Sequence, residues 1–299
     1  MAEVTAQLVK TLRERTGAGM MECRNALVEA NANLDDAEVV LRKRGAAAAA
    51  KKSSRSAKQG LIVIDIAANG LSAVVIEVNC ESDFVARTDD FQAFAADLAA
   101  HVAASSATTV DAIMAEAFSK DPSQTVNDLV KSKIAKLGEN IVLARFERVS
   151  VASGAISSYI HPGSQLAVAV VLTSPAGSSE ELVALGKDLA MQIAAADPKY
   201  IRRDQVDPAH LAKEADIARD RAKNEGKPEK ILDKIVEGRL SKFYEEVCLI
   251  EQPFIKDNGV TVTELIAQKS KATGGAIEVA QFVRFKVGET QSSEEPAAE

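Results

Sequence analysis

The sequence contains no tryptophan, few other aromatic residues and no long apolar run. No apolar segment reaches the roughly 20 residues that cross a bilayer. The N-terminal segment MAEVTAQLVK has the features of neither a signal peptide nor a transit peptide. We therefore expect a cytoplasmic protein without a membrane partner. Alanine is abundant and aromatic residues make up only 4% of the chain, a composition that suggests closely packed helices.

Cysteine and histidine are scarce, with three residues of each in the 299-residue chain. Cys23, Cys80 and Cys248 are too far apart to suggest a disulfide framework or a zinc site, which fits a reducing compartment. The histidines have no metal-binding spacing, and the sequence has no phosphate loop, dinucleotide fingerprint or nucleophile elbow. We expect no metal, no cofactor, no nucleotide bound by this chain and no covalent chemistry. Cys80 is expected to be inert, because the acids Glu81 and Asp83 would raise the pKa of its thiol.

Basic residues are in the minority, since the net charge is −7 at pH 7 and the pI is about 5.3. A general nucleic-acid binder needs a basic surface, so we expect no direct contact with nucleic acid. Residues 42–60 depart from this balance, with seven positive charges, no acidic residue and a run of alanines. This segment is either an RNA-binding patch or a solvated tether. The absence of interleaved aromatic residues favours the tether.

Residues 1–45 have the apolar spacing of three short helices. The segment Thr16–Gly19 interrupts the first helix, and Asp35 with Glu38 has the spacing of a capping box that opens the third. We interpret this segment as a three-helix module, followed by a basic linker over 46–60. The alanines of the linker are compatible with an extension of the third helix.

From residue 61 the apolar pattern changes to a period of two, which is typical of strands. Two β-branched runs, Leu61–Ala67 and Ser72–Val78, flank Asn69–Gly70, a strong hairpin signal. Helical spacing follows, and a strand at Ile141–Val149 closes the unit. We predict a core N-subdomain over 61–150.

The chain then repeats this pattern loosely over a core C-subdomain, 151–288. The stretch that begins at Asp97 resembles the one that begins at Asp188, and the closing strands of the two halves are alike. We predict an α+β protein of several modules, with two related subdomains that each have a three-stranded antiparallel sheet and helices on one face. The second contains a coiled-coil helical hairpin at about 200–250. Residues 289–299 are predicted to form a disordered acidic tail.

Two long motifs resemble the signatures of bacterial elongation factor Ts: LRERTGAGMMECRNAL at 12–27 and EVNCESDFVAR at 77–87. Further similar stretches follow in order along nearly the whole chain, at 136–141, 191–195, 226–239 and 252–254. The family exchanges guanine nucleotides on elongation factor Tu, the GTPase that carries aminoacyl-tRNA to the ribosome. The resemblance implies an N-terminal module similar to ubiquitin-associated domains, two core subdomains, a helical hairpin and a C-terminal module at about 252–275.

The resemblance also implies which residues act on elongation factor Tu. The family's Thr-Asp-Phe-Val motif, which dislodges magnesium from the GTPase, corresponds here to Ser82, Asp83, Phe84 and Val85. Phe84 is expected to wedge in beside the magnesium site, and Asp83 to hydrogen-bond to the partner or to hold the loop. From the residues alone, Phe84 is either a core residue at the end of a strand or an exposed loop residue. The three polar residues before it favour the loop.

Four further positions are expected to contact the partner. A family lysine corresponds to Arg24, which retains the positive charge, and an Ile-Gly pair corresponds to Leu137 and Gly138. A histidine often found in the family is Gln192 here, which puts any protonation role of that side chain in doubt. The residues themselves also fit plainer roles, Arg24 as a solvated helix face and Gly138 as a helix stop, and the latter is compatible with partner contact.

Two other functions fit the sequence less well. One is a non-exchange binding module associated with the translation machinery, which would bind its partner without releasing nucleotide. The other is an enzyme, which would need a buried, convergent set of ionisable groups. An exchange factor instead requires Asp83 and Phe84 to be exposed on a loop.

Overall fold

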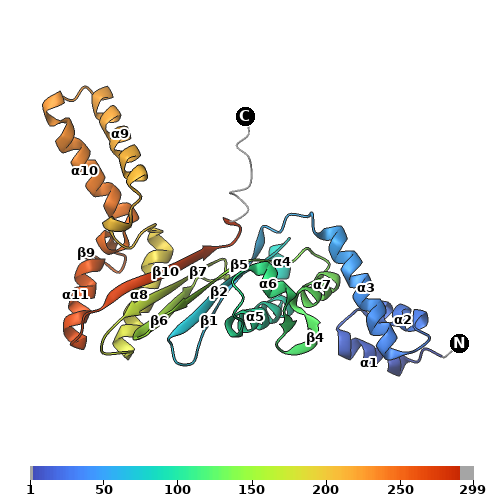
Figure 1. The fold of residues 1–299 in the computed structure, drawn as a ribbon. Coiled ribbons are helices and arrows are strands. Elements are labelled where there is room, and N and C mark those ends of the chain that lie inside the picture. Colours follow the sequence, from blue (N-terminus) through green and yellow to red (C-terminus); the bar gives the residue numbers. More distant parts are fainter. Residues whose placement is uncertain (1–2, 290–299) are drawn as a thin grey trace.

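The computed structural model describes residues 3–289, in which three helices precede two sheet-containing halves and a long helical hairpin (Figure 1). The acidic tail expected at 289–299 lies outside the described residues apart from Glu289. No helix among the described residues is both long enough and apolar enough to span a membrane.

The N-terminal module packs three helices around a small core. These helices are α1 (Ala6–Thr16), α2 (Met20–Glu29) and α3 (Leu34–Lys52). Helix α1 ends at Gly17, whose φ of 67° is the left-handed conformation that glycine adopts readily. Helix α3 continues through the alanine run to Lys52, so the extension of the third helix is confirmed. Leu12, Cys23 and Leu27 are fully buried in the core of this module.

The expected capping box at Asp35 and Glu38 is wrong. Helix α3 begins two residues earlier, and its N-cap is Asn33, whose side-chain oxygen accepts hydrogen bonds from the backbone N–H groups of Asp35 and Asp36. Asn33 is a residue type that favours the N-cap position, and Leu34, the first residue of the helix, packs against the core of the module. The Glu38 carboxylate instead lies 3.3 Å from Arg15 of α1.

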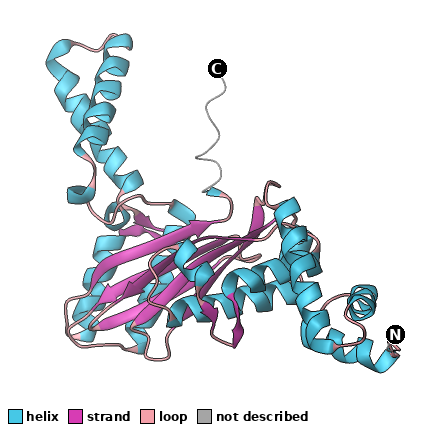
Figure 2. Ribbon diagram, turned by 45° about the vertical axis from the view of Figure 1, so that its right-hand side comes forward, coloured by secondary structure: helices cyan, strands magenta, loops and turns pink. Residues whose placement is uncertain are grey.

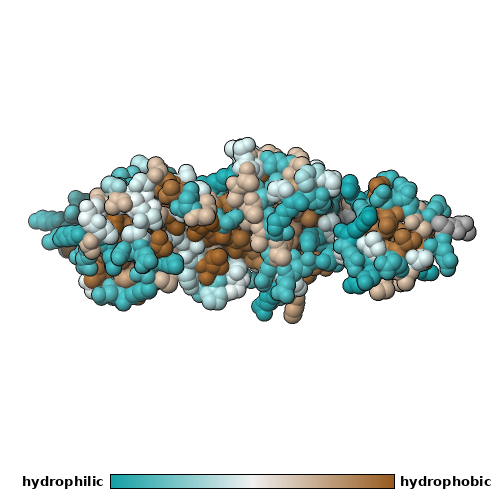
Figure 3. All heavy atoms as spheres, turned by 90° about the horizontal axis from the view of Figure 1, so that it is seen from below, coloured by the Kyte–Doolittle hydropathy of each residue, from teal (hydrophilic) through white to brown (hydrophobic). Residues whose placement is uncertain are grey.

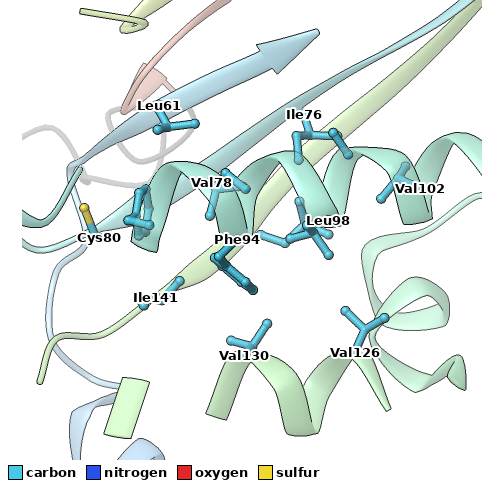
Figure 4. Packing of buried hydrophobic residues seen from close by; sticks show 14 of the residues in the cluster. Leu61, Ile76, Val78, Cys80, Phe94, Leu98, Val102, Val126, Val130 and Ile141 are labelled. Atoms are coloured by element: carbon cyan, nitrogen blue, oxygen red, sulfur yellow. The ribbon is translucent and has the colours of Figure 1, made fainter. Parts of the chain in front are cut away.

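The first half contains a three-stranded antiparallel sheet in the order β1-β2-β5. Its strands are β1 (Gln59–Ile66), β2 (Ser72–Cys80) and β5 (Val142–Ser150). The short helix α4 (Asp83–Ala86) follows β2, and the other elements are α5 (Asp89–Ala104), α6 (Val110–Ala115), β3 (Ala117–Phe118), β4 (Asp121–Thr125) and α7 (Val126–Leu137). Figure 4 shows Phe94 and Leu98 of α5 between Val78 of β2 and Val130 of α7, which together bury one face of the sheet.

The second half repeats this plan, with a sheet in the order β10-β7-β6. Its elements are β6 (Gly154–Ile160), β7 (Leu166–Thr173), α8 (Glu180–Ala196), β8 (Pro253–Phe254), β9 (Asp257–Thr261), α11 (Val262–Thr273) and β10 (Glu278–Lys286). Matching details include a capping box at the start of α7 and of α11, at Thr125 and Thr261. The two related α+β subdomains predicted from the sequence are therefore confirmed.

The two sheets pack against each other through their inner faces. Val75 and Val149 of the first sheet and Ala169 and Phe285 of the second belong to one buried cluster. Because side chains alternate along a strand, Val74 and its neighbours at even positions of β2 face the helices instead. Figure 2 shows the strands of both sheets together in the centre of the molecule with helices around them.

A helical hairpin projects from the second half (Figure 1). It consists of α9 (Pro208–Asn224) and α10 (Glu229–Val247), and the short turns η1 (Arg203–Gln205) and η2 (Leu249–Glu251) flank its base. Ala218 and Ala222 of α9 and Leu232 and Val236 of α10 are buried where the two helices pack together, whereas Ile231, expected from its spacing to face α9, is exposed. Small side chains on α9 allow the two helices to approach closely.

Candidate functional site

The turn after β2 presents Phe84 to solvent. This side chain is 80% exposed, more than any other large hydrophobic side chain in residues 3–289. It lies on α4, a single helical turn that begins three residues after the end of β2 at Cys80. The alternative in which Phe84 is a core residue is therefore wrong. An exposed aromatic ring on a short turn is a candidate contact residue for another macromolecule.

Local contacts hold this turn in shape. The Ser82 hydroxyl caps α4 by accepting a hydrogen bond from the backbone N–H of Val85, at 3.3 Å. The Asp83 carboxylate lies 2.9 Å from the guanidinium of Arg87, one helical turn further on. Val85 packs against the core of the first half. Val85 thus fixes the turn to the body of the protein and the Asp83–Arg87 pair holds the turn itself, while the Phe84 ring is exposed.

A second loop, between α7 and β5, is joined to this turn by Glu139. The Glu139 carboxylate accepts hydrogen bonds from the Glu81 N–H at 3.1 Å, the Ser82 N–H at 2.9 Å and the Ser82 hydroxyl at 2.5 Å. In the other direction, the Glu81 carboxylate accepts a hydrogen bond from the Asn140 N–H at 2.7 Å. The structure therefore brings the Ser82–Val85 turn next to the loop that begins with Leu137 and Gly138.

Sequence reasoning missed the contribution of Glu139. The residue belongs to the stretch 136–141 that resembles the family, but only Leu137 and Gly138 of that stretch were assigned a role. Gly138 ends α7 with a φ of 82°, and no atom lies within 4 Å of the place that a Cβ would occupy. Its role as a helix stop is confirmed, and the space beside it is open to a partner. Leu137 is half-buried against the core.

Arg24 lies on α2 of the N-terminal module, at the right-hand end of the molecule, whereas α4 lies near the centre (Figure 1). It is exposed, and it stands between Met20 and Val28, which are 60% and 56% exposed and one helical turn away on either side. Figure 3 shows the N-terminal module as a separate lobe at the right-hand end of the molecule, with apolar side chains on its surface. Arg24 thus belongs to a mixed apolar and basic helix face rather than to the Phe84 turn.

Gln192 of α8 is buried, with 1% of its surface exposed. Its amide donates hydrogen bonds to the Gln252 side chain and the Pro253 carbonyl, and its oxygen accepts one from the Ile255 N–H at 2.8 Å. The position corresponds to His101 of the first half, whose Nδ1 accepts a hydrogen bond from the Ser119 N–H. Contact of Gln192 with a partner stays a prediction. Within the chain, its amide group is hydrogen-bonded to the turn at Pro253–Ile255, in which Ile255 is exposed.

Cys80 is buried beneath the Phe84 turn. Its Sγ donates a hydrogen bond to the Ser82 carbonyl at 3.1 Å. Burial, followed by the charges of Glu139 and Asp83, raises the pKa of the Cys80 thiol to about 12. A thiol of this kind is protonated at neutral pH, which makes it a poor nucleophile. The inertness expected for Cys80 agrees with its surroundings.

A buried charged cluster joins the two halves of the molecule near this site. Glu77 of β2 is fully buried and accepts hydrogen bonds from the Asn79 side chain at 3.1 Å, the Gly288 N–H at 2.8 Å and the Arg145 guanidinium at 2.7 Å. The Arg145 guanidinium also lies 4.0 Å from the centre of the Phe285 ring. Both Glu77 oxygens already have partners within the chain, so this cluster has the character of a structural joint rather than of an enzyme's reactive site.

Charged side chains near the N-terminal module and α7 also have partners within residues 3–289. A cleft of about 620 Å³ lies between the N-terminal module and α7, and its charged walls include Arg15, which pairs with Glu38, and Lys136, which lies 2.9 Å from Asp90. In the basic segment, Lys52 donates a hydrogen bond to a carbonyl of α7. No group of three or more histidine, cysteine or acidic residues in the described part of the chain has an arrangement that could hold a metal ion.

Comparison with known proteins gives one consistent family. The family described as Elongation factor TS matches residues 81–289. Elongation factor Ts of Clostridium kluyveri is 47% identical over 297 residues, which cover 99% of this chain and 97% of that protein. The factors of Clostridium acetobutylicum and Clostridium perfringens are 46% and 45% identical over 297 residues, again with 99% of this chain and 96% and 97% of theirs.

Proposed function

Because the chain belongs to the elongation factor Ts family, the nucleotide-exchange factors of elongation factor Tu, we propose that it binds elongation factor Tu with GDP and promotes GDP release by a wedge at Phe84. GTP can then enter the vacated site. An exchange factor of this kind carries out no covalent chemistry of its own. Elongation on bacterial ribosomes is a cytoplasmic process, in line with the expected location.

The observation that carries this proposal is the exposure of Phe84 on a turn whose neighbours are fixed. The ring is 80% exposed, whereas Val85 is packed against the core and Ser82 is hydrogen-bonded to Glu139. In the proposed complex this ring inserts beside the magnesium site of the GTPase and displaces the ion. Loss of Mg²⁺ removes the charge that neutralises the phosphates of GDP, so the nucleotide is bound less tightly.

The energetics require more than one residue. Weakening GDP binding about 10⁴-fold needs roughly 5.5 kcal/mol of differential binding, and one buried aromatic hot spot supplies about 2–4 kcal/mol. We propose that the rest comes from a wide interface that includes Arg24 of the N-terminal module, Leu137 and Gly138 beside the wedge, and the region of Gln192. The coupling is reciprocal: if this chain lowers the affinity of elongation factor Tu for GDP by some factor, GDP lowers the affinity of elongation factor Tu for this chain by the same factor.

The test is stopped-flow release of fluorescent GDP from elongation factor Tu. The parent chain is expected to accelerate release in a concentration-dependent way. Phe84→Ala is expected to lower the maximal rate about 30-fold, which corresponds to about 2 kcal/mol. Ile231→Ala is a matched control, because it also removes an exposed apolar side chain, 42% exposed on the hairpin and remote from the turn (Figure 1).

Each outcome has a distinct meaning. Acceleration that is unchanged in Phe84→Ala would retain exchange activity but contradict the wedge. A stable complex without acceleration would contradict exchange and leave the non-exchange binding module as the function.

A further inference from the structure

We propose that Glu139 is a positioning residue for nucleotide exchange, which with Glu81 locks the Phe84 turn and the Gly138 loop into one rigid contact surface. The proposal rests on the function proposed above, because the residue that it positions is the Phe84 wedge. Glu139 reaches Phe84 only through the backbone and side chain of Ser82 and the backbone of Glu81.

The Glu139 carboxylate is placed where it controls the direction of the chain after β2. Only Glu81 and Ser82 lie between the end of β2 at Cys80 and the start of α4 at Asp83. Glu139 accepts the backbone N–H of both residues, as well as the Ser82 hydroxyl that caps α4. Hydrogen bonds to a carboxylate are roughly twice as strong as neutral ones. The short connection that carries Phe84 therefore has little freedom.

The second loop is held by the reverse contact. The Glu81 carboxylate accepts the Asn140 N–H at 2.7 Å, and the same oxygen lies 3.6 Å from the Arg55 guanidinium. Asn140 is buried and its side-chain amide donates to the Arg55 carbonyl at 2.8 Å. Because each loop holds the other by a carboxylate, neither can move alone without breaking a charge-assisted hydrogen bond.

The second half of the molecule provides an internal comparison. There Gly275 and Ala276 follow the C-cap Gly274 of α11, where Glu139 and Asn140 follow Gly138 of α7. A Cβ on Gly275 would lie 3.7 Å from the Cβ of Ala176, so the same two loops meet without a carboxylate. The connection from β7 to α8 also has no counterpart of α4.

This comparison separates positioning from folding. The second half has the same sheet order, and its helix α11 follows the hairpin of β8 and β9 as α7 follows that of β3 and β4. It forms this architecture without the two carboxylates, so the architecture does not depend on them. They occur in the half that presents Phe84. A loosened turn would place Phe84 in the inserting orientation for a smaller fraction of the time, and the apparent effect of the wedge would fall by that fraction.

The experiment uses the full chain with Glu139→Gln, which keeps the shape of the side chain and removes its charge and one acceptor. We expect backbone amide hydrogen exchange in the segment 80–87 to become about 10- to 100-fold faster, since a hydrogen bond to a charged group is lost. The maximal rate of GDP release from elongation factor Tu is expected to fall about tenfold. Added to Phe84→Ala, the same substitution is expected to have less than about a twofold further effect, because both act through one ring.

The matched control is Glu278→Gln on the exposed face of β10, at the position that corresponds to Val142 in the first half. It is expected to leave both hydrogen exchange in 80–87 and the release rate within about twofold of the parent. If Glu139→Gln does not fold by circular dichroism, Glu81→Gln replaces it, because that variant weakens the contact with Asn140 by removing its charge and leaves Glu139 in place.

Two results would overturn the positioning role alone: a parent release rate in Glu139→Gln, or equal fold-losses from Glu139→Gln with and without Phe84. If Phe84→Ala released GDP at the parent rate, the wedge would be refuted and the positioning role with it. The Phe84→Ala variant therefore distinguishes a failure of the positioning role of Glu139 from a failure of the Phe84 wedge.

Discussion

Replacing Glu77 should reveal how strongly one buried carboxylate holds the two halves together. Glu77 has no exposed surface, and it accepts hydrogen bonds from Asn79 of its own strand, from Arg145 of β5 and from the Gly288 N–H beyond β10. Glu77→Ala leaves the guanidinium of Arg145 without its main partner and leaves the buried amide of Asn79 without its acceptor. Removing one member of a buried ion pair costs about 3–5 kcal/mol, so we expect a loss of that size in the free energy of unfolding.

The assay is urea unfolding followed by circular dichroism, with the midpoint and slope fitted separately. Glu77→Gln, which retains one acceptor, is expected to cost about 2 kcal/mol. Glu147→Gln is the control, because Glu147 is an exposed strand residue that also contacts β10, through Gln281 at 3.2 Å; its cost should stay below about 0.5 kcal/mol. A loss of less than about 1 kcal/mol in Glu77→Ala would refute the reasoning, since it would mean that Arg145 and Asn79 find water or other partners at little cost.

Two further predictions concern stability. Gly138→Ala should lower the free energy of unfolding by about 1 kcal/mol, because φ is 82° at this position. Gly238→Ala should raise it by about 0.5–1 kcal/mol, because Gly238 lies within α10 and no atom lies within 4 Å of the added Cβ. Urea midpoints that move in the same direction for both variants would contradict this. The buried Cys80 thiol, with its pKa raised from 9.0 to about 12, favours the folded state below pH 9 and loses that advantage as the pH rises from 9 toward 12, because only the unfolded thiol ionises there. Stability should therefore fall by about 1.4 kcal/mol per pH unit on account of this group, and Cys80→Ala should flatten the profile measured between pH 9 and 10.5; an unchanged slope would count against the assignment.

Much of the fold could be predicted because its signals are local. The period of two and the Asn69–Gly70 turn define the first hairpin, and the similarity between the segments at Asp97 and Asp188 reveals the duplication. The hairpin of β3 and β4 could not be found in this way, because a strand of two residues, Ala117–Phe118, has no measurable period. The backbone N–H of Ser119, in the turn of this hairpin, donates a hydrogen bond to His101, 18 residues earlier, which no local pattern reports.

The exposure of the site could be predicted, because the residues next to Phe84 in the sequence indicate a loop. Three polar residues before Phe84 indicated a loop, and the ring is indeed exposed. The contribution of Glu139 could not be derived, because its partners Glu81 and Ser82 are more than fifty residues away and no local pattern reports such a contact. The burial of Gln192 likewise results from the turn at Pro253, which comes much later in the chain.

Because side chains from both sheets form one buried cluster, the order in which the chain is synthesised determines when that cluster is completed. The inner face of the first sheet, with Ile62 and Val75, is complete once β5 has been synthesised, but Val283 and Phe285 of β10 join the same cluster only after the whole hairpin of α9 and α10 has followed. During that interval Ile156 of β6 and Ala169 of β7 can already cover part of this face, but the part that β10 covers stays exposed on the nascent chain, the kind of surface on which chaperones act and from which aggregation starts. A factor that serves protein synthesis would thus itself be most vulnerable while it is being synthesised.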